Sequence, residues 1–168
     1  MMEQFRARNI PIQSKPELKA KYQKKPTVGG HKNAAYAGMI ESMDDSIGAV
    51  QATLKKLKLD DNTIVVFFSD NGGHGAVTSN APLRGSKGML YEGGIREPLV
   101  VKWPGVTKAG STCREPVIGV DFYPTFMEAA GIKRPKKLKL DGLSFVPCLK
   151  DASASLGREA LYLSLIHI

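Results

Sequence analysis

The clearest periodic pattern in the chain is a stripe of apolar residues spaced three and four positions apart. Its members are Tyr36, Met39, Ile40, Met43, Ile47, Val50, Leu54 and Leu57. This spacing puts the side chains on one face of a helix, so it predicts an amphipathic helix from about Ala34 to Leu57. Asn33 is suited to the N-cap, and three lysines follow at the end where the helix dipole favours cations (Lys55, Lys56 and Lys58).

An unbroken run of β-branched and aromatic residues follows this helix. The run is Thr63-Ile64-Val65-Val66-Phe67-Phe68. A run without polar alternation is typical of a strand that is buried on both faces, as in a parallel sheet covered by helices. A helix that leads directly into such a strand predicts an α/β fold with a mostly parallel sheet and flanking helices.

The remaining segments carry weaker patterns. We expect a short helix around Lys15–Tyr22, a strand over Pro98–Trp103 and a helix over Asp121–Ala130 that ends at Gly131. Residues 143–149 are expected to form a loop with one short strand.

Composition and charge restrict the partners. The 168 residues carry a formal net charge of +8, which allows a preference for anionic partners. The basic residues do not alternate with aromatic ones, as they do in proteins that bind single-stranded nucleic acid, so we expect no nucleic-acid partner. No stretch approaches the ~18–20 apolar residues of a membrane span, and the first residues lack the apolar core of a secretory signal.

The two cysteines, Cys113 and Cys148, are far apart in the sequence. Neither belongs to a C-x-x-C pair, which argues against a zinc site or a thioredoxin-like motif. We expect two ordinary thiols, with a disulfide between them as the alternative.

The sharpest local feature is the sequence Ser-Asp-Asn-Gly-Gly-His at positions 69–74, directly after the predicted buried strand. In open α/β sheets, ligands bind beyond the carboxyl ends of the strands. The side-chain oxygens of Asp70 and Asn71 could point there, and oxygen donors suit a hard cation such as Ca²⁺ or Mg²⁺. From spacing alone, a tight turn without a ligand explains the same residues.

A glycine-rich segment at positions 82–98 contains Lys87 between Ser86 and Gly88. A lysine in such a loop is a compact positive charge suited to an oxyanion. The segment is not a P-loop, because G-x-x-x-x-G-K-[ST] is absent.

These two motifs, followed by Val-Lys-Trp-Pro-Gly at 101–105, closely resemble the sulfatase family of the alkaline-phosphatase-like superfamily. The resemblance extends over residues 8–162, through the segments Tyr36–Gly48, Asp121–Thr125 and Leu140–Ser144. It implies a hydrolase of sulfate esters or sulfamates, acting on a sulfated small molecule such as an aryl sulfate or on a glycan. Members of the family use a formylglycine, matured from cysteine or serine, together with Ca²⁺.

Individual roles follow from matching positions. The resemblance implies that Asp70 and Asn71 are two of the calcium ligands. It implies that Lys87 contacts the sulfate and helps to stabilise the departing oxygen. His74 and Arg84 could bind substrate; loop residues without a ligand are the alternative for both.

The sequence also departs from the family pattern. The maturation motif C/S-x-P-S-R and the two aspartates that complete the calcium shell are absent, and Asn9 stands where the family usually has a histidine. We therefore expect residues 1–162 to be a partial catalytic domain that lacks the nucleophile region and has an incomplete calcium site. Such a chain should be inactive alone. Residues 163–168 are expected to be an atypical tail, and the resemblance implies a secreted, periplasmic or lysosomal parent.

Two other functions remain open at this point. A phosphoester or phosphonate hydrolase of the same superfamily would share part of the metal motif. A non-catalytic module could instead bind anions through its basic residues. The nucleophile segment would distinguish these functions from a sulfatase.

Overall fold

The computed structural model describes residues 12–164, so that Asn9 and the last four residues of the tail lie outside the described range. The chain divides into two compact units. The first contains the described residues up to Asp60 together with Phe67–Leu99, and the second contains Asp61–Val66 and Val100–Tyr162.

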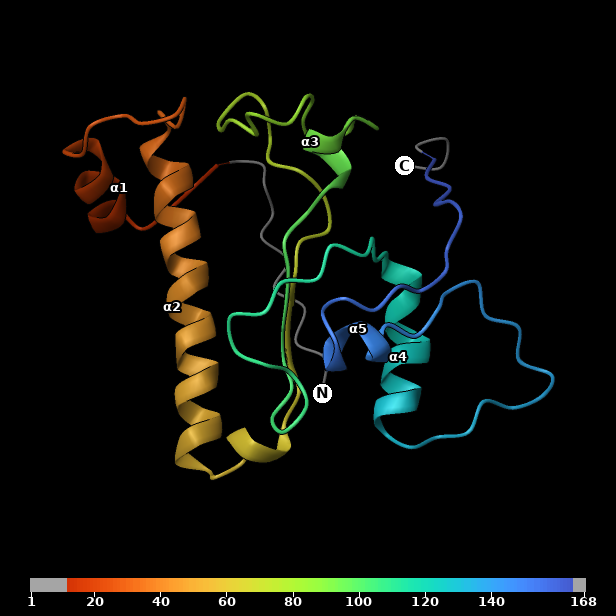
Figure 1. Ribbon diagram of the computed structural model, residues 1–168. Helices are drawn as coiled ribbons and strands as arrows, with labels where there is room; N and C mark the ends of the chain where they lie inside the picture. The colour runs from red at the N-terminus through yellow and green to blue at the C-terminus, as the bar shows by residue number, and fades with distance from the viewer. Residues whose placement is uncertain (1–11, 165–168) are drawn as a thin grey trace. The chain divides into compact units, whose positions relative to one another are not determined.

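Two helices, α1 (Pro16–Gln23) and α2 (Ala34–Lys56), lie side by side in the first unit (Figure 1). The N-cap predicted for α2 is confirmed, because the Asn33 side chain accepts a hydrogen bond from the Tyr36 N–H at 3.0 Å. The helices approach closely at Gly38, where a Cβ atom would lie 3.1 Å from the Cβ atom of Leu18 in α1. Their contact also includes an ion pair between Lys21 and Glu41 at 2.5 Å.

The described residues contain a two-stranded sheet formed by β1 (Val65–Phe68) and β2 (Leu99–Lys102). A 3₁₀ turn, η1 (Asp60–Asn62), precedes β1. Beyond the strands, the Ser69 N–H bonds to the Pro98 carbonyl and the Gly72 N–H to the Gly94 carbonyl, so the two segments run in opposite directions. The α/β class is confirmed, and the parallel neighbours expected for β1 are not among the described residues.

The strand β1 is less buried than its unbroken apolar run predicts. Val65, Val66 and Phe67 are half-buried, and Phe68 is 39% exposed. The physical reason is the number of neighbours: one paired strand covers less of β1 than the two helical layers of a parallel sheet would.

The second unit contains η2 (Gly119–Asp121), α4 (Phe122–Ala129) and α5 (Val146–Lys150). Its core includes Phe145 and Val146, each 2% exposed, and the Phe122 ring packs edge-on against Phe145 at 5.5 Å between centroids. The helix α5 replaces the loop and short strand expected over residues 143–149. Pro147 lies in its first turn, where a proline needs no hydrogen-bond donor.

None of the helices in the described part of the chain is both long and apolar enough to cross a membrane.

Candidate functional site

The Asp-Asn turn begins where β1 ends, within the first unit. Ser69 Oγ donates a hydrogen bond to the Asn71 carbonyl at 3.1 Å, and Asn71 Nδ2 donates to the Gly72 carbonyl at 3.1 Å. These local bonds give the turn a defined shape. The Asp70 side chain is exposed and that of Asn71 is half-buried.

Gly72 packs directly on the backbone of the short helix α3 (Glu92–Ile95), which the sequence did not predict. Its N–H donates to the Gly94 carbonyl at 3.1 Å, and a Cβ atom at Gly72 would lie 1.9 Å from the Gly93 carbonyl oxygen. Any side chain here would therefore push the turn away from α3.

The lysine loop meets the same turn. The Lys87 N–H donates to the Gly73 carbonyl at 3.2 Å, so the backbones of the two motifs are in contact although they are separated in the sequence. The Lys87 side chain is exposed. Convergence of its ammonium group with Asp70 and Asn71 on one crevice stays a prediction, which this backbone contact supports.

Asn80 joins the two motifs by hydrogen bonds. The sequence did not predict this role. Asn80 Oδ1 accepts from the Gly73 N–H at 3.1 Å, while Nδ2 donates to the carbonyls of Gly73 and Gly85 at 3.1 and 3.2 Å. One amide thus holds the turn after β1 against the lysine loop. A single asparagine in a loop carries no sequence signal for such a role, because the role depends on which backbones meet.

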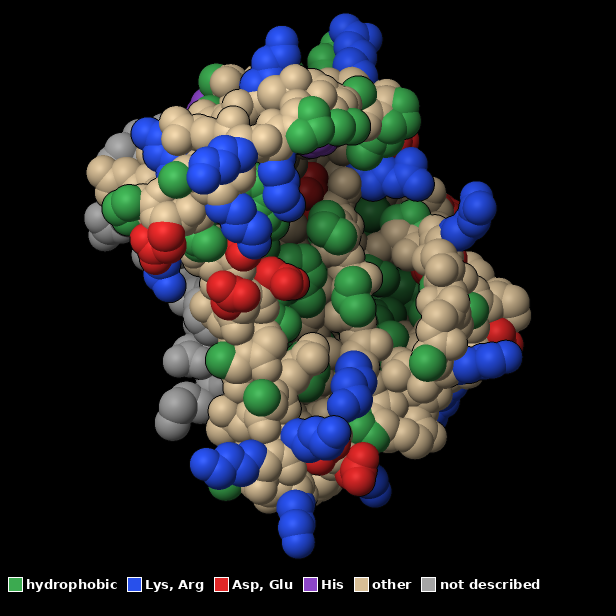
Figure 2. Space-filling model, turned by 90° about the vertical axis from the view of Figure 1, so that its left-hand side faces the viewer, with side chains coloured by type: hydrophobic (Ala, Val, Ile, Leu, Met, Phe, Trp, Pro, Cys, Tyr) green, Lys and Arg blue, Asp and Glu red, His purple; other side chains and the backbone are tan. Residues whose placement is uncertain are grey.

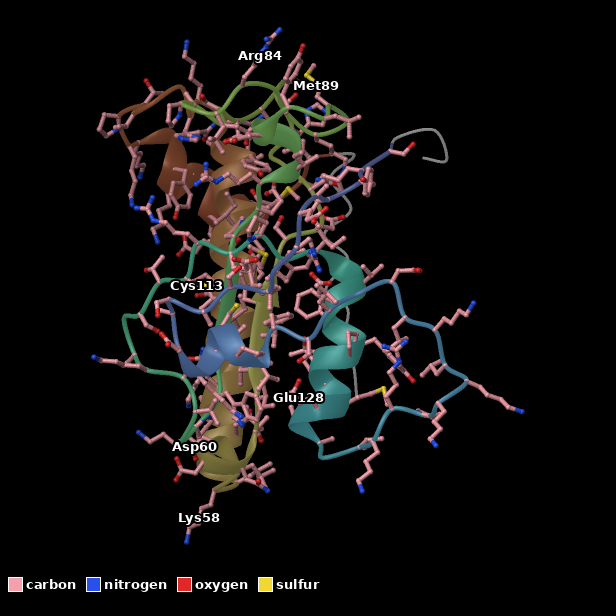
Figure 3. All side chains as sticks on the ribbon, turned by 45° about the vertical axis from the view of Figure 1, so that its right-hand side comes forward. Lys58, Asp60, Arg84, Met89, Cys113 and Glu128 are labelled. Atoms are coloured by element: carbon pink, nitrogen blue, oxygen red, sulfur yellow. The ribbon has the colours of Figure 1, made fainter. Side chains whose placement is uncertain are left out.

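The two candidate substrate-binding residues are positioned differently. His74 Nδ1 accepts a hydrogen bond from the Ala76 N–H at 3.2 Å, which assigns the proton of the neutral ring to Nε2. The Arg84 guanidinium lies over the Tyr91 ring, 3.9 Å from its centroid. Figure 3 shows Arg84 extending outward from the loop.

A shallow hollow of about 270 Å³ lies beside the turn that follows His74. Lys32 and Asn33 line it together with Gly30 and residues 75–78. The adjoining segment is anchored by a 2.8 Å hydrogen bond between His31 Nδ1 and Thr78 Oγ1. Lys32 is therefore the positively charged residue among those that line the hollow.

Glu97 is a half-buried carboxylate that feels the negative charge of Asp70. Burial raises the pKa of Glu97 above its ordinary value, and the negative charge of Asp70 adds to this effect. Burial also raises the pKa of Tyr36, with a contribution from the charge of Glu97. Glu92, by contrast, is exposed and pairs with Arg96 at 3.0 Å.

The donors present suit a calcium ion but do not complete its shell. Asp70 and Asn71 offer the oxygen atoms that Ca²⁺ prefers, whereas a full shell takes about 6–8 oxygens. Within residues 12–164, no group of three or more His, Cys, Asp and Glu side chains is close enough together to hold a metal ion. The residues thus fit part of a calcium site.

Comparison with known proteins agrees with these motifs. The family model described as Sulfatase matches residues 4–132. A sulfatase of Formosa agariphila is 39% identical over 161 residues, which cover 89% of this chain and 29% of that protein. The chain thus spans less than a third of the length of this relative.

Solved structures give the same result. The structure of Ps i-CgsB in complex with k-i-k-neocarrahexaose matches with a TM-score of 0.76 and 37% identity, over 84% of this chain and 31% of that one. The structure of BT4656 in complex with its substrate D-glucosamine-2-N,6-O-disulfate matches with a TM-score of 0.60 and 29% identity, over 79% of this chain and 27% of that one. The observed α/β arrangement is part of the alkaline-phosphatase-like fold of these proteins. With the family match covering most of its length, the chain belongs to the sulfatase family.

Proposed function

We propose that this chain is part of a sulfuric ester hydrolase and supplies two metal ligands and a sulfate-binding lysine to its active site. The observation that carries the proposal is the 3.2 Å hydrogen bond from the Lys87 N–H to the Gly73 carbonyl. It joins the lysine loop to the Asp-Asn turn in a chain of the sulfatase family.

The exposed Lys87 ammonium group is the element of the site that binds the anion. It would contact a sulfate oxygen and stabilise the negative charge that develops on the departing oxygen as the S–O bond breaks. Asn80 acts as a positioning residue, because its three hydrogen bonds fix the loop that carries Lys87.

Asp70 and the side-chain oxygen of Asn71 would hold the calcium ion. When bound, such an ion orients the sulfate group and neutralises part of its charge. The Asn71 amide nitrogen already donates to the Gly72 carbonyl, so the oxygen is the atom of this side chain suited to a cation.

His74 and Arg84 would contact the rest of an anionic substrate. The His74 Nε2–H is a donor that can reach a sulfate or sugar oxygen, because Nδ1 is occupied by the Ala76 N–H. The stacked Arg84 keeps its positive charge in a restricted position on the loop that precedes Lys87. Sulfated glycans are the substrate class that the two matched structures favour, since one holds a neocarrahexaose and the other a disulfated glucosamine.

The positive charge of the basic side chains on the first unit suits an anionic substrate of this kind. Figure 2 shows Lys and Arg side chains spread over the face that carries α1 and α2, with fewer Asp and Glu among them. This charge would attract a polyanion at long range and would contribute to its rate of association.

The polypeptide alone should not turn over sulfate esters, because its 168 residues contain no C/S-x-P-S-R sequence to mature into the nucleophile. Catalytic groups that act as a unit retain little activity when one is removed. A phosphoester hydrolase is disfavoured by the family match, and a non-catalytic anion-binding module would need no nucleophile anywhere.

The DNA that flanks the coding sequence provides the first test. We expect an in-frame C/S-x-P-S-R segment upstream, and a longer protein that hydrolyses an aryl sulfate in preference to the matching aryl phosphate. A flanking sequence without that segment would support the anion-binding module, and preference for the phosphate would support the alternative hydrolase. Turnover of the aryl sulfate by the 168-residue chain alone would contradict the assignment of the nucleophile.

A further inference from the structure

The two cysteines, separated by more than thirty positions, meet inside the second unit. Cys113 is close enough to Cys148 for its thiol to contribute to the raised pKa of Cys148. Cys148 lies on α5 and is 8% exposed, with its Sγ atom 3.6 Å from the Ala154 carbonyl oxygen. Cys113 lies on the loop after β2, where Figure 3 labels it beside α5.

Other contacts hold the two cysteine-bearing segments together. Cys113 Sγ accepts a hydrogen bond from the Glu115 N–H at 3.5 Å. The Glu115 carboxylate in turn accepts from the Leu156 N–H at 3.1 Å, two residues beyond the carbonyl that Cys148 contacts. The loop that carries Cys113 and the helix α5 that carries Cys148 are therefore both bonded to residues 154–156, which holds the two thiols in the same region of the unit.

We propose that Cys113 and Cys148 are a modification site, where a small disulfide oxidant such as oxidised glutathione converts the two thiols into an intramolecular disulfide. The Cys113 thiolate attacks one sulfur of the oxidant, forming a mixed disulfide and releasing one glutathione. Cys148 then loses its proton to solvent and attacks the Cys113 sulfur, releasing the second glutathione. Two protein thiols are oxidised, and one molecule of oxidised glutathione is reduced to two of the thiol form.

The surroundings of the two thiols set this order. Cys113 is half-buried on a loop and open to the oxidant, whereas Cys148 is covered. Burial, together with the neighbouring Cys113 thiol, raises the pKa of Cys148 to about 11, which keeps it protonated until the mixed disulfide is beside it. Attack by the thiolate and not the thiol makes Cys113 the first to react.

The disulfide would tie the loop after β2 to α5 and close a segment that contains α4 and most of the core of the second unit. Closing a loop of this length restricts the unfolded chain, so the oxidised protein should melt at a higher temperature by roughly 5–10 °C. The function of the pair would be stabilisation of this unit under oxidising conditions.

The test uses the folded chain in buffers of increasing oxidised-to-reduced glutathione ratio, with intact mass, peptide mapping and the melting temperature as readouts. We expect the mass to fall by two hydrogen atoms, the Cys113 and Cys148 peptides to become linked, and the melting temperature to rise. Reduction with dithiothreitol should reverse all three changes.

Two single variants test the order of reaction. Cys148→Ser should accumulate a glutathione adduct on Cys113, whereas Cys113→Ser should leave Cys148 unmodified in the folded protein. Each of three results with the unaltered chain would overturn the proposal: a stable adduct on Cys113, disulfide-linked dimers as the main product, or reaction of Cys148 only in denaturant.

Discussion

The residues buried inside the first unit differ in kind from those buried inside the second. In the second unit the fully buried side chains are two apolar and two polar or charged ones, namely Phe145, Val146, Thr125 and Asp121. In the first unit every residue that is buried within the described range is a glycine: Gly38, Gly72, Gly93 and Gly94. The second unit thus has buried side chains that pack and bond, whereas the buried residues of the first unit are glycines at which backbones approach closely.

This difference predicts which kind of substitution should destabilise each unit. Removing a side chain should damage the second unit, because the groups around it would lose their contacts or their partner. Adding a single methyl group should damage the first unit, because three of its buried glycines hold the loops of the candidate site against one another. Asp70 and Lys87 of the site-bearing unit are exposed, whereas Asp121, the carboxylate of the second unit with three hydrogen bonds, is buried.

The largest expected effect is that of Asp121→Ala in the second unit. The Asp121 carboxylate is fully buried and accepts from Arg158 Nη2 at 2.5 Å and from the N–H groups of Ile118 and Leu143, both at 2.9 Å. Its loss leaves a buried guanidinium unpaired, so the free energy of unfolding should fall by about 3–5 kcal/mol. Urea denaturation would measure this, with the exposed Asp141→Ala as the matched control. A loss of stability no larger than that of the control would show that the buried Asp121 carboxylate does not stabilise the second unit.

A smaller loss is expected for Gly72→Ala in the first unit. The added Cβ would lie 1.9 Å from the Gly93 carbonyl oxygen, and the backbone shift needed to relieve this overlap should cost about 1–3 kcal/mol. Gly48→Ala is the control, because a Cβ at this position in α2 meets nothing within 4 Å. It should stabilise the protein by about 0.5–1 kcal/mol. Equal effects of the two substitutions would show that backbone approach does not hold this unit.

The stability that Asp121 contributes to the second unit and the stability that Glu97 contributes to the first unit should change with pH in opposite directions. Burial alone would raise the pKa of Asp121, but the hydrogen bonds from Arg158 and from two backbone N–H groups outweigh it and leave the pKa below its ordinary value. Its stabilising contribution is therefore present above about pH 4 and lost as the pH falls further. The raised pKa of Glu97 gives the reverse: a contribution present below about pH 4 and lost as the pH rises toward neutral.

Melting temperatures of Asp121→Asn and Glu97→Gln, measured against the unaltered chain across this pH range with a chelator present, would check both signs. The advantage of the unaltered chain over Asp121→Asn should grow with rising pH. Its advantage over Glu97→Gln should shrink. Parallel profiles for the two variants would be inconsistent with the environments described for these carboxylates.

The smallest expected effect is that of calcium on the isolated chain. Asp70 is one carboxylate and Asn71 is neutral, Lys87 is on the loop in contact with the turn, and the chain carries a net charge of +8. Binding should be too weak for millimolar Ca²⁺ to raise the melting temperature, since stabilisation grows only as RT ln(1 + [L]/Kd). A calcium-dependent rise that disappears in Asp70→Ala would show that this chain holds a more complete site.

Local sequence patterns were enough to predict the long helix and its cap. The apolar stripe and Asn33 predicted a helix from Ala34 to Leu57, and α2 spans Ala34–Lys56. The four- and five-residue helices α3 and α5 were missed, because elements this short have no periodic signal and depend on tertiary contacts. The half-burial of β1 could not be predicted either, since it depends on the neighbours that the strand has.

The candidate site shows the same division. Asp70, Asn71 and Lys87 lie in motifs that resemble those of sulfatases, and their positions are therefore evident in the sequence. Asn80 lies outside these motifs, and Glu97 lies in the second motif without a role that the motif assigns to it. Asn80 matters because the backbones of Gly73 and Gly85 come within reach of one amide. Glu97 matters because its burial and the negative charge of Asp70 raise its pKa.

The role proposed for Lys87 is to bind the sulfate in the active site of a sulfatase. The most direct test is kcat/KM for an aryl sulfate, measured on a polypeptide that joins this chain to a formylglycine-bearing segment encoded upstream. Lys87→Ala should lower kcat/KM by about 10²–10³-fold through loss of charge stabilisation in the transition state. Lys108→Ala, which removes an exposed lysine of the second unit, should leave it unchanged. An undiminished kcat/KM in Lys87→Ala would contradict the proposed role of Lys87 in binding the sulfate.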